Sequence, residues 1–342
     1  MVAGICGIGL TGAGAVNDLL KEYDDIQGGM EDEFTLLYIP DGILDLEYHL
    51  VKQPERFFSS DIALRRFEDY VKKVAGEPHG YYNRWTNYRF YEISMRYIKS
   101  ITQMKWRGAW QFDSYMCPEM VRNIKYRILD QRILSPLQYH LKKKIITFLD
   151  RDMYLSIRPD FFYEKTKRYL KELFTVMGYD TNGKIFVNQL FAGNNPEAGM
   201  QFFDHAKAIV VERDPRDIYL SQKNGRSVVH HWSPTDTVES FADYYRYCRN
   251  GADYSSKNVL LIHFEDLIYQ YEDTVRKIEN FLGIYKHVRK KAFFNPAVTI
   301  QNTQLFAGNS AVKKETAYIE KHLAGYLYDF TGYEKRKPAA KT

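Results

Sequence analysis

The stretch that decides the fold reads Ile209-Val-Val-Glu-Arg213-Asp-Pro-Arg-Asp217-Ile-Tyr-Leu-Ser221. An apolar run that ends in a Pro-containing polar cluster is typical of a buried strand in a parallel sheet. Open α/β sheets bind their ligands at the carboxyl ends of such strands. There, Arg213 offers a planar fork of donors that suits a phosphate, and Ser221 on the following helix can add a hydroxyl. A surface cluster of Arg–Asp ion pairs in a strand–helix turn is the alternative.

A glycine-rich loop near the start of the chain predicts a second anion site. The strand Val2–Cys6 leads into Gly7–Gly14, and the helix Ala15–Tyr23 follows. Glycines let a backbone approach a ligand closely, and the N–H groups and dipole at a helix start favour a phosphate or sulfate. Thr11 can add a hydroxyl. A glycine-rich turn without a ligand is the alternative.

Two familiar nucleotide motifs can be compared with this loop. No Lys follows Gly12 or Gly14, so the GxxxxGK[ST] loop of ATPases and GTPases is absent. Gly7, Gly9 and Gly12 fit the dinucleotide pattern GxGxxG, which leaves an NAD(P)-dependent oxidoreductase open. That pattern also needs an acid at the end of the second strand, and Asp41 lies too far along the chain to match it well.

Strands and helices alternate along much of the chain. This pattern predicts an α/β fold, a P-loop-like and mostly parallel sheet flanked by helices, within a single domain over residues 1–342. Residues 44–180 show helical periods and no convincing strand. We expect them to form a helical insertion above the carboxyl ends of the strands, where it would cover the ligand crevice and shape an acceptor site. The predicted strands are Val2–Cys6, Phe34–Ile39, Lys184–Leu190, Lys207–Glu212 and Asn258–Phe264, and the predicted helices near the end are Val238–Arg249, Leu267–Leu282 and Thr316–Phe330.

Composition narrows the function classes. The formal net charge of +5 is spread along the chain, whereas nucleic-acid binders concentrate Lys and Arg. Cys6, Cys117 and Cys248 form no CxxC pair, so we expect no metal site. Their odd number indicates a reducing compartment and a cytoplasmic protein. No run approaches the roughly twenty apolar residues that a membrane span requires.

Taken together, these elements resemble the sulfotransferases that use 3′-phosphoadenosine 5′-phosphosulfate. The resemblance rests on the loop Gly9–Gly14, on Arg213-Asp-Pro-Arg-Asp with the spaced Ser221, on Asn258–Leu282, and on Phe330-Thr-Gly-Tyr333. It implies that Arg213 and Ser221 hold the 3′-phosphate of the donor. It also implies that the loop N–H groups of Gly9, Leu10, Thr11, Gly12, Ala13, Gly14 and Ala15 hold the 5′-phosphosulfate.

Two further features of the family can be compared with this chain. Asn302, Lys313 and Lys314 occupy the place where family members fold a loop over the nucleotide, and a solvated basic loop is the alternative. The family's phosphate loop usually carries a Lys or Arg, and this chain has Leu10-Thr-Gly12 there. A cation must therefore come from elsewhere, or the donor is bound differently. The candidates are Arg84, Lys105, Arg107 and Lys184.

Sulfuryl transfer needs an in-line approach, a stabilised leaving phosphate and a base, without a metal or a covalent protein intermediate. Asp18 is the first candidate base because it lies four residues after Gly14 on one helix face, where some carbohydrate sulfotransferases carry a Glu. His230 and His231 are the second candidates. Candidate acceptor contacts are Asn188, Gln189, Asn194 and Trp232.

The leading hypothesis is an enzyme that moves a sulfuryl group to a hydroxyl of a small molecule or saccharide. The implied partners are a nucleotide donor and this acceptor, with no nucleic acid. Three rivals remain: the oxidoreductase, a non-catalytic protein that kept only the anion pocket, and transfer of a phosphate-like group from another 3′-phosphorylated nucleotide. The sequence leaves the acceptor and the oligomeric state open.

Overall fold

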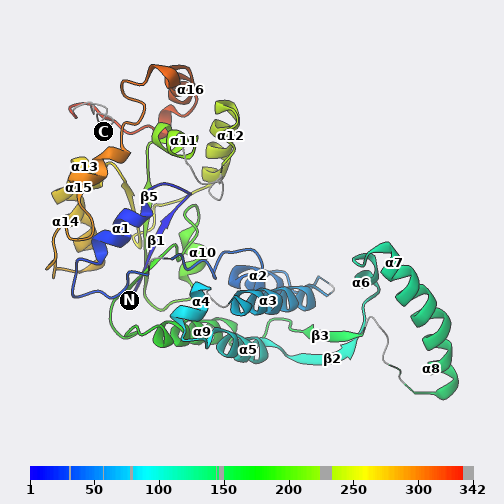
Figure 1. Cartoon of the computed structure of the whole chain (residues 1–342). Coiled ribbons are helices and arrows are strands. Elements are labelled where there is room, and N and C mark those ends of the chain that lie inside the picture. Colours follow the sequence, from blue (N-terminus) through cyan, green and yellow to red (C-terminus); the bar gives the residue numbers. More distant parts are fainter. Residues whose placement is uncertain are drawn as a thin grey trace.

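A four-stranded parallel sheet forms the centre of the molecule (Figure 1). The computed structural model describes the chain except residues 31, 57, 78–79, 144, 146–149, 224–232 and 334–342. The strands are β1 (Val2–Gly7), β4 (Ile185–Asn188), β5 (Ala206–Glu212) and β6 (Val259–His263), in the spatial order β4-β1-β5-β6. Helices flank this sheet, which confirms the predicted α/β class.

The alternation of side chains along the strands divides the core between two faces. Ile5, Ile209 and Val211 point to one face, which is covered by α1 (Ala13–Leu20), α13 (Asp266–Tyr269) and α14 (Tyr271–Leu282). Cys6 and Val210 point to the other face and pack against residues of the insertion. Parallel strands buried on both faces have near-continuous apolar sequences, which is why β5 could be recognised directly.

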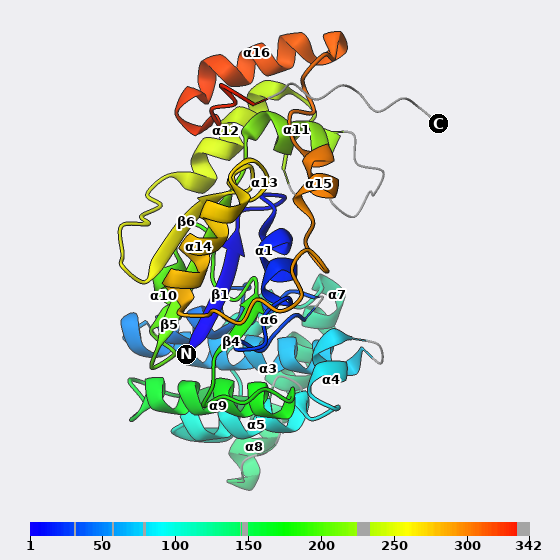
Figure 2. The same ribbon diagram turned by 90° about the vertical axis from the view of Figure 1, so that its left-hand side faces the viewer.

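Helices at the carboxyl ends of the strands form a third packed layer (Figure 2). α11 (Pro215–Lys223), α12 (Val238–Arg249) and α16 (Lys313–His322) share one apolar cluster. The short α10 (Pro196–Met200) follows β4 and is capped by the side chain of Asn195, which accepts from the N–H of Ala198. The predicted last helix was too long, because α16 ends at His322 and a 3₁₀ turn, Ala324–Tyr326, follows.

The insertion does not lie where the sequence analysis placed it. Figures 1 and 2 show its helices toward the amino ends of the strands, away from the carboxyl ends. Its apolar side chains, Phe67 and Ile98 among them, pack with sheet residues such as Val187. Burial of this large apolar surface explains the position. The helices of this part are α2 (Ile43–Glu47), η1 (Tyr48–Lys52), α3 (Ser59–Gly76), α4 (Tyr81–Trp85), α5 (Phe90–Ile101) and α9 (Phe162–Val176).

The insertion also contains two strands that the sequence analysis missed. β2 (Met104–Gly108) and β3 (Arg151–Leu155) pair antiparallel and project from the body as an arm (Figure 1). β2 is exposed over nearly its whole length. Its sequence therefore lacks the alternation of apolar and polar residues by which a half-buried strand is recognised. The arm carries α6 (Gln111–Tyr115), α7 (Glu119–Val121), the π-helix η2 (Arg122–Leu134) and α8 (Ser135–Leu141).

The predicted strand Phe34–Ile39 is also wrong. Its residues form turns next to the edge strand β4, with the N–H of Phe34 donating to the carbonyl of Asn188. Phe34, Leu36 and Leu37 are fully buried, so the apolar run marks a core segment, not a sheet strand. A short apolar run alone does not distinguish a buried strand from another buried segment of the core.

Two findings concern membranes and metals. None of the helices in the described part of the chain combines the length and apolarity needed to cross a membrane. Within the same residues, no group of three or more His, Cys, Asp or Glu side chains is placed to hold a metal ion.

Candidate active site

The glycine-rich loop turns sharply at the carboxyl end of β1. Gly9, Leu10 and Gly12 have φ values of 60°, 54° and 92°, in the left-handed region. A side chain at Gly12 would also collide with the ring of Phe264, at 2.3 Å from an ideal Cβ. α1 starts at Ala13 without a side-chain cap and without an acid in its first turn. The N–H groups at this helix start therefore remain suited to an anion.

Arg213 connects this loop with two other parts of the chain. One guanidinium nitrogen, Nη1, donates to the carbonyl of Leu10 at 3.0 Å. The other, Nη2, donates to Ser221 Oγ at 3.0 Å and to the carbonyl of Asn302 at 2.6 Å. The guanidinium also lies 5.2 Å from the centre of the Phe264 ring. The loop and the Arg-Asp-Pro-Arg-Asp turn therefore meet at one place.

The surroundings of Arg213 are mostly buried. Its exposed fraction is 7%, and its Nε has no hydrogen-bond partner in the described structure. Burial lowers the pKa of Arg213, and the nearby charges of Asp217, Glu265 and Asp214 oppose that shift. An arginine keeps its positive charge through shifts of this kind. The site thus holds a cation in which the three bonds above use three of five N–H donors, while the Nε donor and the second donor of Nη1 take no part in them.

A cavity of about 510 Å³ joins the predicted anion sites. Most of the predicted residues line it: Leu10, Thr11, Gly12, Ala13, Gly14, Ala15, Asp18, Asn188, Gln189, Arg213, Ser221 and Asn302. Gly9 belongs to the same loop without lining the cavity. His230, His231 and Trp232 lie outside the described residues.

Three other predicted residues are not brought to this cavity. Lys313 and Lys314 are exposed at the start of α16, and Lys313 lines a different cavity beside Arg216. This happens because α16 packs on α11 and α12, which carries its first turn away from Arg213. Asn194 is exposed beside the capping residue Asn195 and does not line the cavity.

None of the four candidate cations reaches the loop. Arg84 pairs with Asp32, and Lys184 donates to the carbonyl of Gly283. Lys105 and Arg107 both pair with Asp152, on the arm. Among the described residues that line the cavity, Arg213 is the only Lys or Arg.

Five residues of the cavity lining were not predicted from the sequence: Glu33, Phe264, Phe293, Phe294 and Thr299. Glu33 directly precedes the apolar run Phe34–Ile39, and a strand there would place Glu33 at the amino end of the sheet. Phe264 is the last residue of the predicted strand Asn258–Phe264. Because open α/β sheets bind ligands at the carboxyl ends of their strands, this position could have predicted a place in the cavity lining. Nothing in the local sequence indicates the role of Phe293, because a distant residue, Glu22, holds that segment.

Glu22 positions the two phenylalanines of the cavity. Its buried carboxylate accepts from the N–H groups of Lys291, Phe293 and Phe294, each at 2.9 Å, and from His287 Nε2 at 2.6 Å. Burial works to raise the pKa of Glu22, but these hydrogen bonds prevail and lower it. The segment that contains Phe293 and Phe294 is thus fixed beside the glycine-rich loop.

The two cavity acids differ in their surroundings. Asp18 forms an ion pair with Lys21 at 2.9 Å, and its side chain is 45% exposed. Glu33 is also an exposed residue, but it lies against the cavity, where desolvation and then the charge of Asp32 raise its pKa. A raised pKa brings a carboxylate closer to the range of an effective general base.

Buried carboxylates hold the frame around Arg213. Asp217 accepts from the N–H groups of Gln304 at 2.8 Å and Leu305 at 2.7 Å, which fixes the segment that presents Asn302 to Arg213. Burial raises the pKa of Asp217 to about 7, against the opposing charge of Arg213. Glu265 accepts from the N–H of Asp214, and burial raises its pKa to about 8.

The sequence of this region matches a known family. Residues 156–287, from the end of β3 to the segment after α14, match the family model described as "Sulfotransferase family". These residues are less than half of the chain, and over them it is similar to the sulfotransferases, a family of transferases. The matched segment contains Arg213 and Ser221, while the glycine-rich loop lies before it.

No curated protein matches this chain. Its fold is similar to three solved structures at low identity. The sulfotransferase domain of the Synechococcus PCC 7002 olefin synthase has 12% identity, covers 96% of this chain and 94% of its own, and gives a TM-score of 0.41. Retinol dehydratase, in complex with androsterone and the inactive cofactor PAP, has 10% identity, coverages of 98% and 82%, and a TM-score of 0.34.

The third structure is a sulfotransferase from Mycobacterium tuberculosis H37Rv. It has 13% identity, covers 89% of this chain and 76% of its own, and gives a TM-score of 0.33. Because all three TM-scores are below 0.5, the similarity of this chain to sulfotransferases is carried by residues 156–287 alone.

Proposed function

We propose that this chain transfers a sulfuryl group from 3′-phosphoadenosine 5′-phosphosulfate to a hydroxyl of a small-molecule or saccharide acceptor. The observation that carries the proposal is the shared cavity of Arg213 and the glycine-rich loop. A nucleotide with phosphates at both ends fits two anion sites in one cavity. The volume of about 510 Å³ lies in the usual range for a small-molecule site.

The residues present suit each end of this donor. Arg213, with its unpartnered Nε, and Ser221 would hold the 3′-phosphate. The loop from Leu10 to Gly14, which includes the start of α1, would hold the 5′-phosphosulfate through N–H groups, whereas the N–H of Ala15 donates to the carbonyl of Gly12. The same N–H groups would stabilise the charge that develops on the leaving phosphate, in place of the loop cation that is missing.

The acceptor hydroxyl needs a base beside the loop, and Glu33 fits this role better than Asp18. Both line the cavity, but Asp18 is already paired with Lys21, and Glu33 has a raised pKa. In the proposed step, Glu33 takes the hydroxyl proton as the acceptor oxygen bonds to sulfur. The bond between sulfur and the 5′-phosphate oxygen breaks, and 3′-phosphoadenosine 5′-phosphate leaves.

Binding and turnover together test the proposal. Titration calorimetry should show binding of 3′-phosphoadenosine 5′-phosphate and none of NADH at the same concentration. Transfer of labelled sulfate to a panel of saccharides and small alcohols should identify an acceptor class. Glu33→Gln should lower kcat about 10²- to 10⁴-fold with unchanged nucleotide affinity. The exposed Glu197→Gln serves as the matched control.

Each rival has its own outcome in these experiments. Tight NADH binding without binding of the desulfated nucleotide would support the oxidoreductase. The oxidoreductase alternative also requires a second strand after the glycine-rich loop, and Phe34–Ile39 forms turns instead. Nucleotide binding without turnover on any acceptor would support a binding protein. A phosphorylated product would support another 3′-phosphorylated donor. If Asp18→Asn lowers kcat and Glu33→Gln does not, Asp18 and not Glu33 is the general base.

The prediction of a cytoplasmic location rests on cysteine usage. Cys6, Cys117 and Cys248 are all free. A reducing compartment is compatible with this state, and fractionation of the source cells with an antibody against the chain would test it.

A further inference from the structure

The arm ends in a helix whose apolar side chains are exposed. We call the continuous helix Glu119–Leu141, formed by α7, η2 and α8, the arm helix. Six of its apolar side chains have exposed fractions from 44% to 74%: Met120, Ile124, Ile128, Ile133, Leu137 and Leu141. Large apolar side chains gathered on an exposed element indicate an interaction surface.

The spacing of these six residues places them on one side of the arm helix. They follow one another at intervals of four, four, five, four and four residues. In an α-helix with 3.6 residues per turn, such a row would wind around the axis. The central part, Arg122–Leu134, is a π-helix, whose i→i+5 bonds give a wider turn. The wider turn keeps the row together as one apolar stripe.

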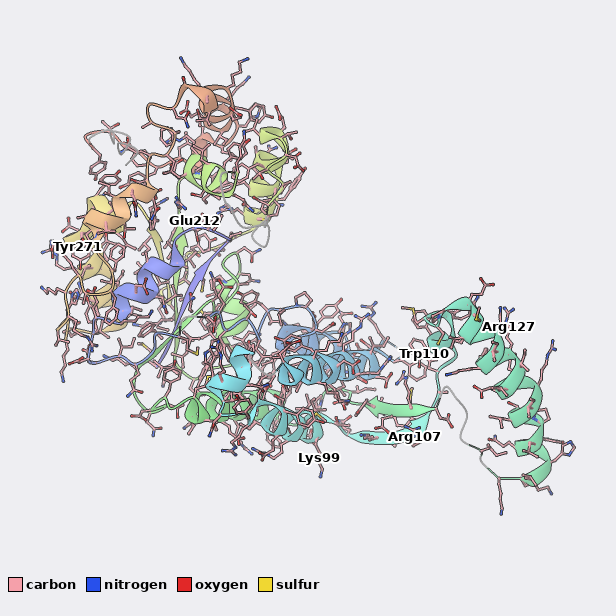
Figure 3. All side chains as sticks on the ribbon, in the orientation of Figure 1. Lys99, Arg107, Trp110, Arg127, Glu212 and Tyr271 are labelled. Carbon is pink, nitrogen blue, oxygen red and sulfur yellow. The ribbon has the colours of Figure 1, made fainter. Side chains whose placement is uncertain are left out.

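Nothing in the described chain covers this stripe. Asp130 is the only buried residue in Glu119–Leu141. Figure 3 shows Arg127 on the arm helix at the opposite end of the molecule from Tyr271. Helices in proteins owe most of their stability to the packing of an apolar face, so this one lacks its main source of stability.

The arm is fixed to the body at its base. Arg151, the first residue of β3, donates to both carboxylate oxygens of Asp61 in α3, at 3.1 and 2.8 Å, and to Asp113 at 2.7 Å. The carboxylate of Asp61 also accepts from the N–H of Tyr154 at 3.0 Å. The arm helix is therefore held out from the body by a partly buried ionic anchor.

The positive charge of the arm helix indicates which kind of partner covers the apolar stripe. Residues 119–143 contain the bases Arg122, Lys125, Arg127, Arg132, Lys142 and Lys143 against the acids Glu119 and Asp130. Arg127 and Arg132 are exposed and directly precede the stripe residues Ile128 and Ile133. Two copies of such a helix would repel one another, whereas an anionic lipid surface attracts it. An apolar stripe flanked by bases is typical of helices that lie in a membrane interface.

We propose that the arm helix docks the protein on membranes rich in anionic lipids. The stripe enters the boundary between headgroups and acyl chains, and the flanking bases contact the lipid phosphates. The nearby exposed aromatic side chains Trp106, Phe112 and Tyr115 lie at the level of the headgroups. The site cavity is on the body of the protein and remains open during docking, because none of its lining residues belongs to the arm.

Vesicle flotation of the full chain tests this proposal. We expect binding to vesicles of phosphatidylglycerol and phosphatidylcholine at least about tenfold stronger than to phosphatidylcholine alone, and weaker at high salt. The triple variant Ile124→Ser, Ile128→Ser, Ile133→Ser should lose binding about a hundredfold or more. Arg127→Ala and Arg132→Ala should each lower it about fivefold. Tyr247→Ser and Tyr285→Ser, exposed on the body, are the matched controls.

A second measurement needs no variant. Trypsin should cleave the wild-type chain after Arg127 or Arg132, and phosphatidylglycerol vesicles should protect these sites while phosphatidylcholine vesicles do not. Equal cleavage with both kinds of vesicle would overturn the proposal. So would a dimer in light scattering that the triple serine variant dissociates, together with absence of flotation, since the stripe would then be a contact between two copies.

Discussion

In most folded proteins apolar side chains are buried and charged side chains are exposed. The cavity and the arm helix depart from this distribution in opposite directions. Around the cavity, a charged side chain is buried: Arg213 is 7% exposed and is surrounded by polar groups. On the arm helix, apolar side chains are exposed, as with Ile128 at 45%. Buried charge and exposed apolar surface are the informative exceptions in a folded protein. Both exceptions are costly for an isolated chain, and binding of the proposed nucleotide and of the proposed lipid surface would offset these costs.

The two regions also differ in how they are held. Several elements far apart in the sequence meet at Arg213, which contacts Leu10, Ser221 and Asn302. The arm helix instead joins the body through the hairpin and α6, where α3 pairs with Arg151 and Asp113. Changes near the cavity should therefore affect both ligand binding and folding, whereas changes on the arm helix should leave folding intact.

The largest effect on nucleotide affinity is expected from Arg213→Ala. Removing this group takes away the only Lys or Arg among the described cavity residues and its hydrogen bonds to Leu10, Ser221 and Asn302. We expect the affinity for 3′-phosphoadenosine 5′-phosphate to fall about 100- to 1,000-fold, as for other buried charge pairs. Titration calorimetry measures this loss. Arg246→Ala, exposed on α12, is the control, and a loss under about threefold for Arg213→Ala would contradict the role of Arg213.

The pH dependence of stability should reveal the buried carboxylate Glu265. Its pKa of about 8 in the folded protein lies above the usual 4.5, so the folded state binds the proton more tightly than the unfolded state. This contribution to stability is complete below about pH 4.5 and is lost as the pH rises toward about 8. Relative to Glu265→Gln, the wild type should lose about 2–4 kcal/mol between pH 5 and 8.

Urea unfolding at both pH values measures the free energy of unfolding for this comparison. Glu197→Gln, an exposed acid, is the control and should follow the wild type at each pH. Parallel curves for the wild type and Glu265→Gln would show that Glu265 is ionised in the folded protein throughout, contrary to the expectation.

The smallest effect is expected on the arm. Ile128→Ala should change the free energy of unfolding by less than about 0.5 kcal/mol, because the exposed side chain of Ile128 buries little apolar surface on folding. The matched core variant Ile93→Ala, at 1% exposure in α5, should cost about 2–5 kcal/mol. Urea unfolding compares the two. An equal loss for both would mean that the stripe packs against protein in solution.

Much of the fold could be read from the sequence because the main signals are local. The apolar run before Arg213 predicted β5, and Val238–Arg249 was predicted with the bounds that α12 has. The failures involve Phe34–Ile39 and the arm strands. An apolar run buried by turns looks like a strand, and an exposed pair of strands lacks the alternation that marks one.

The cavity lining could be predicted in part for the same reason. Leu10, Arg213 and Ser221 lie in local motifs at the carboxyl ends of strands, and all three line the cavity, while their roles stay predictions. Phe293 and Phe294 were missed because the buried carboxylate of Glu22, over 260 residues earlier in the chain, brings them to the cavity. Lys313 and Lys314 were misplaced because the packing of α16 decides where its first turn lies.

The sequence by itself determined the parallel sheet, the glycine-rich turn after β1 and the arginine at the end of β5, since each depends on residues adjacent in the chain. Only the tertiary structure decided that Arg213 meets the loop, that Glu33 faces the same cavity, and that the insertion packs away from it. These depend on which apolar surfaces bury one another over long separations, and no local pattern records that choice.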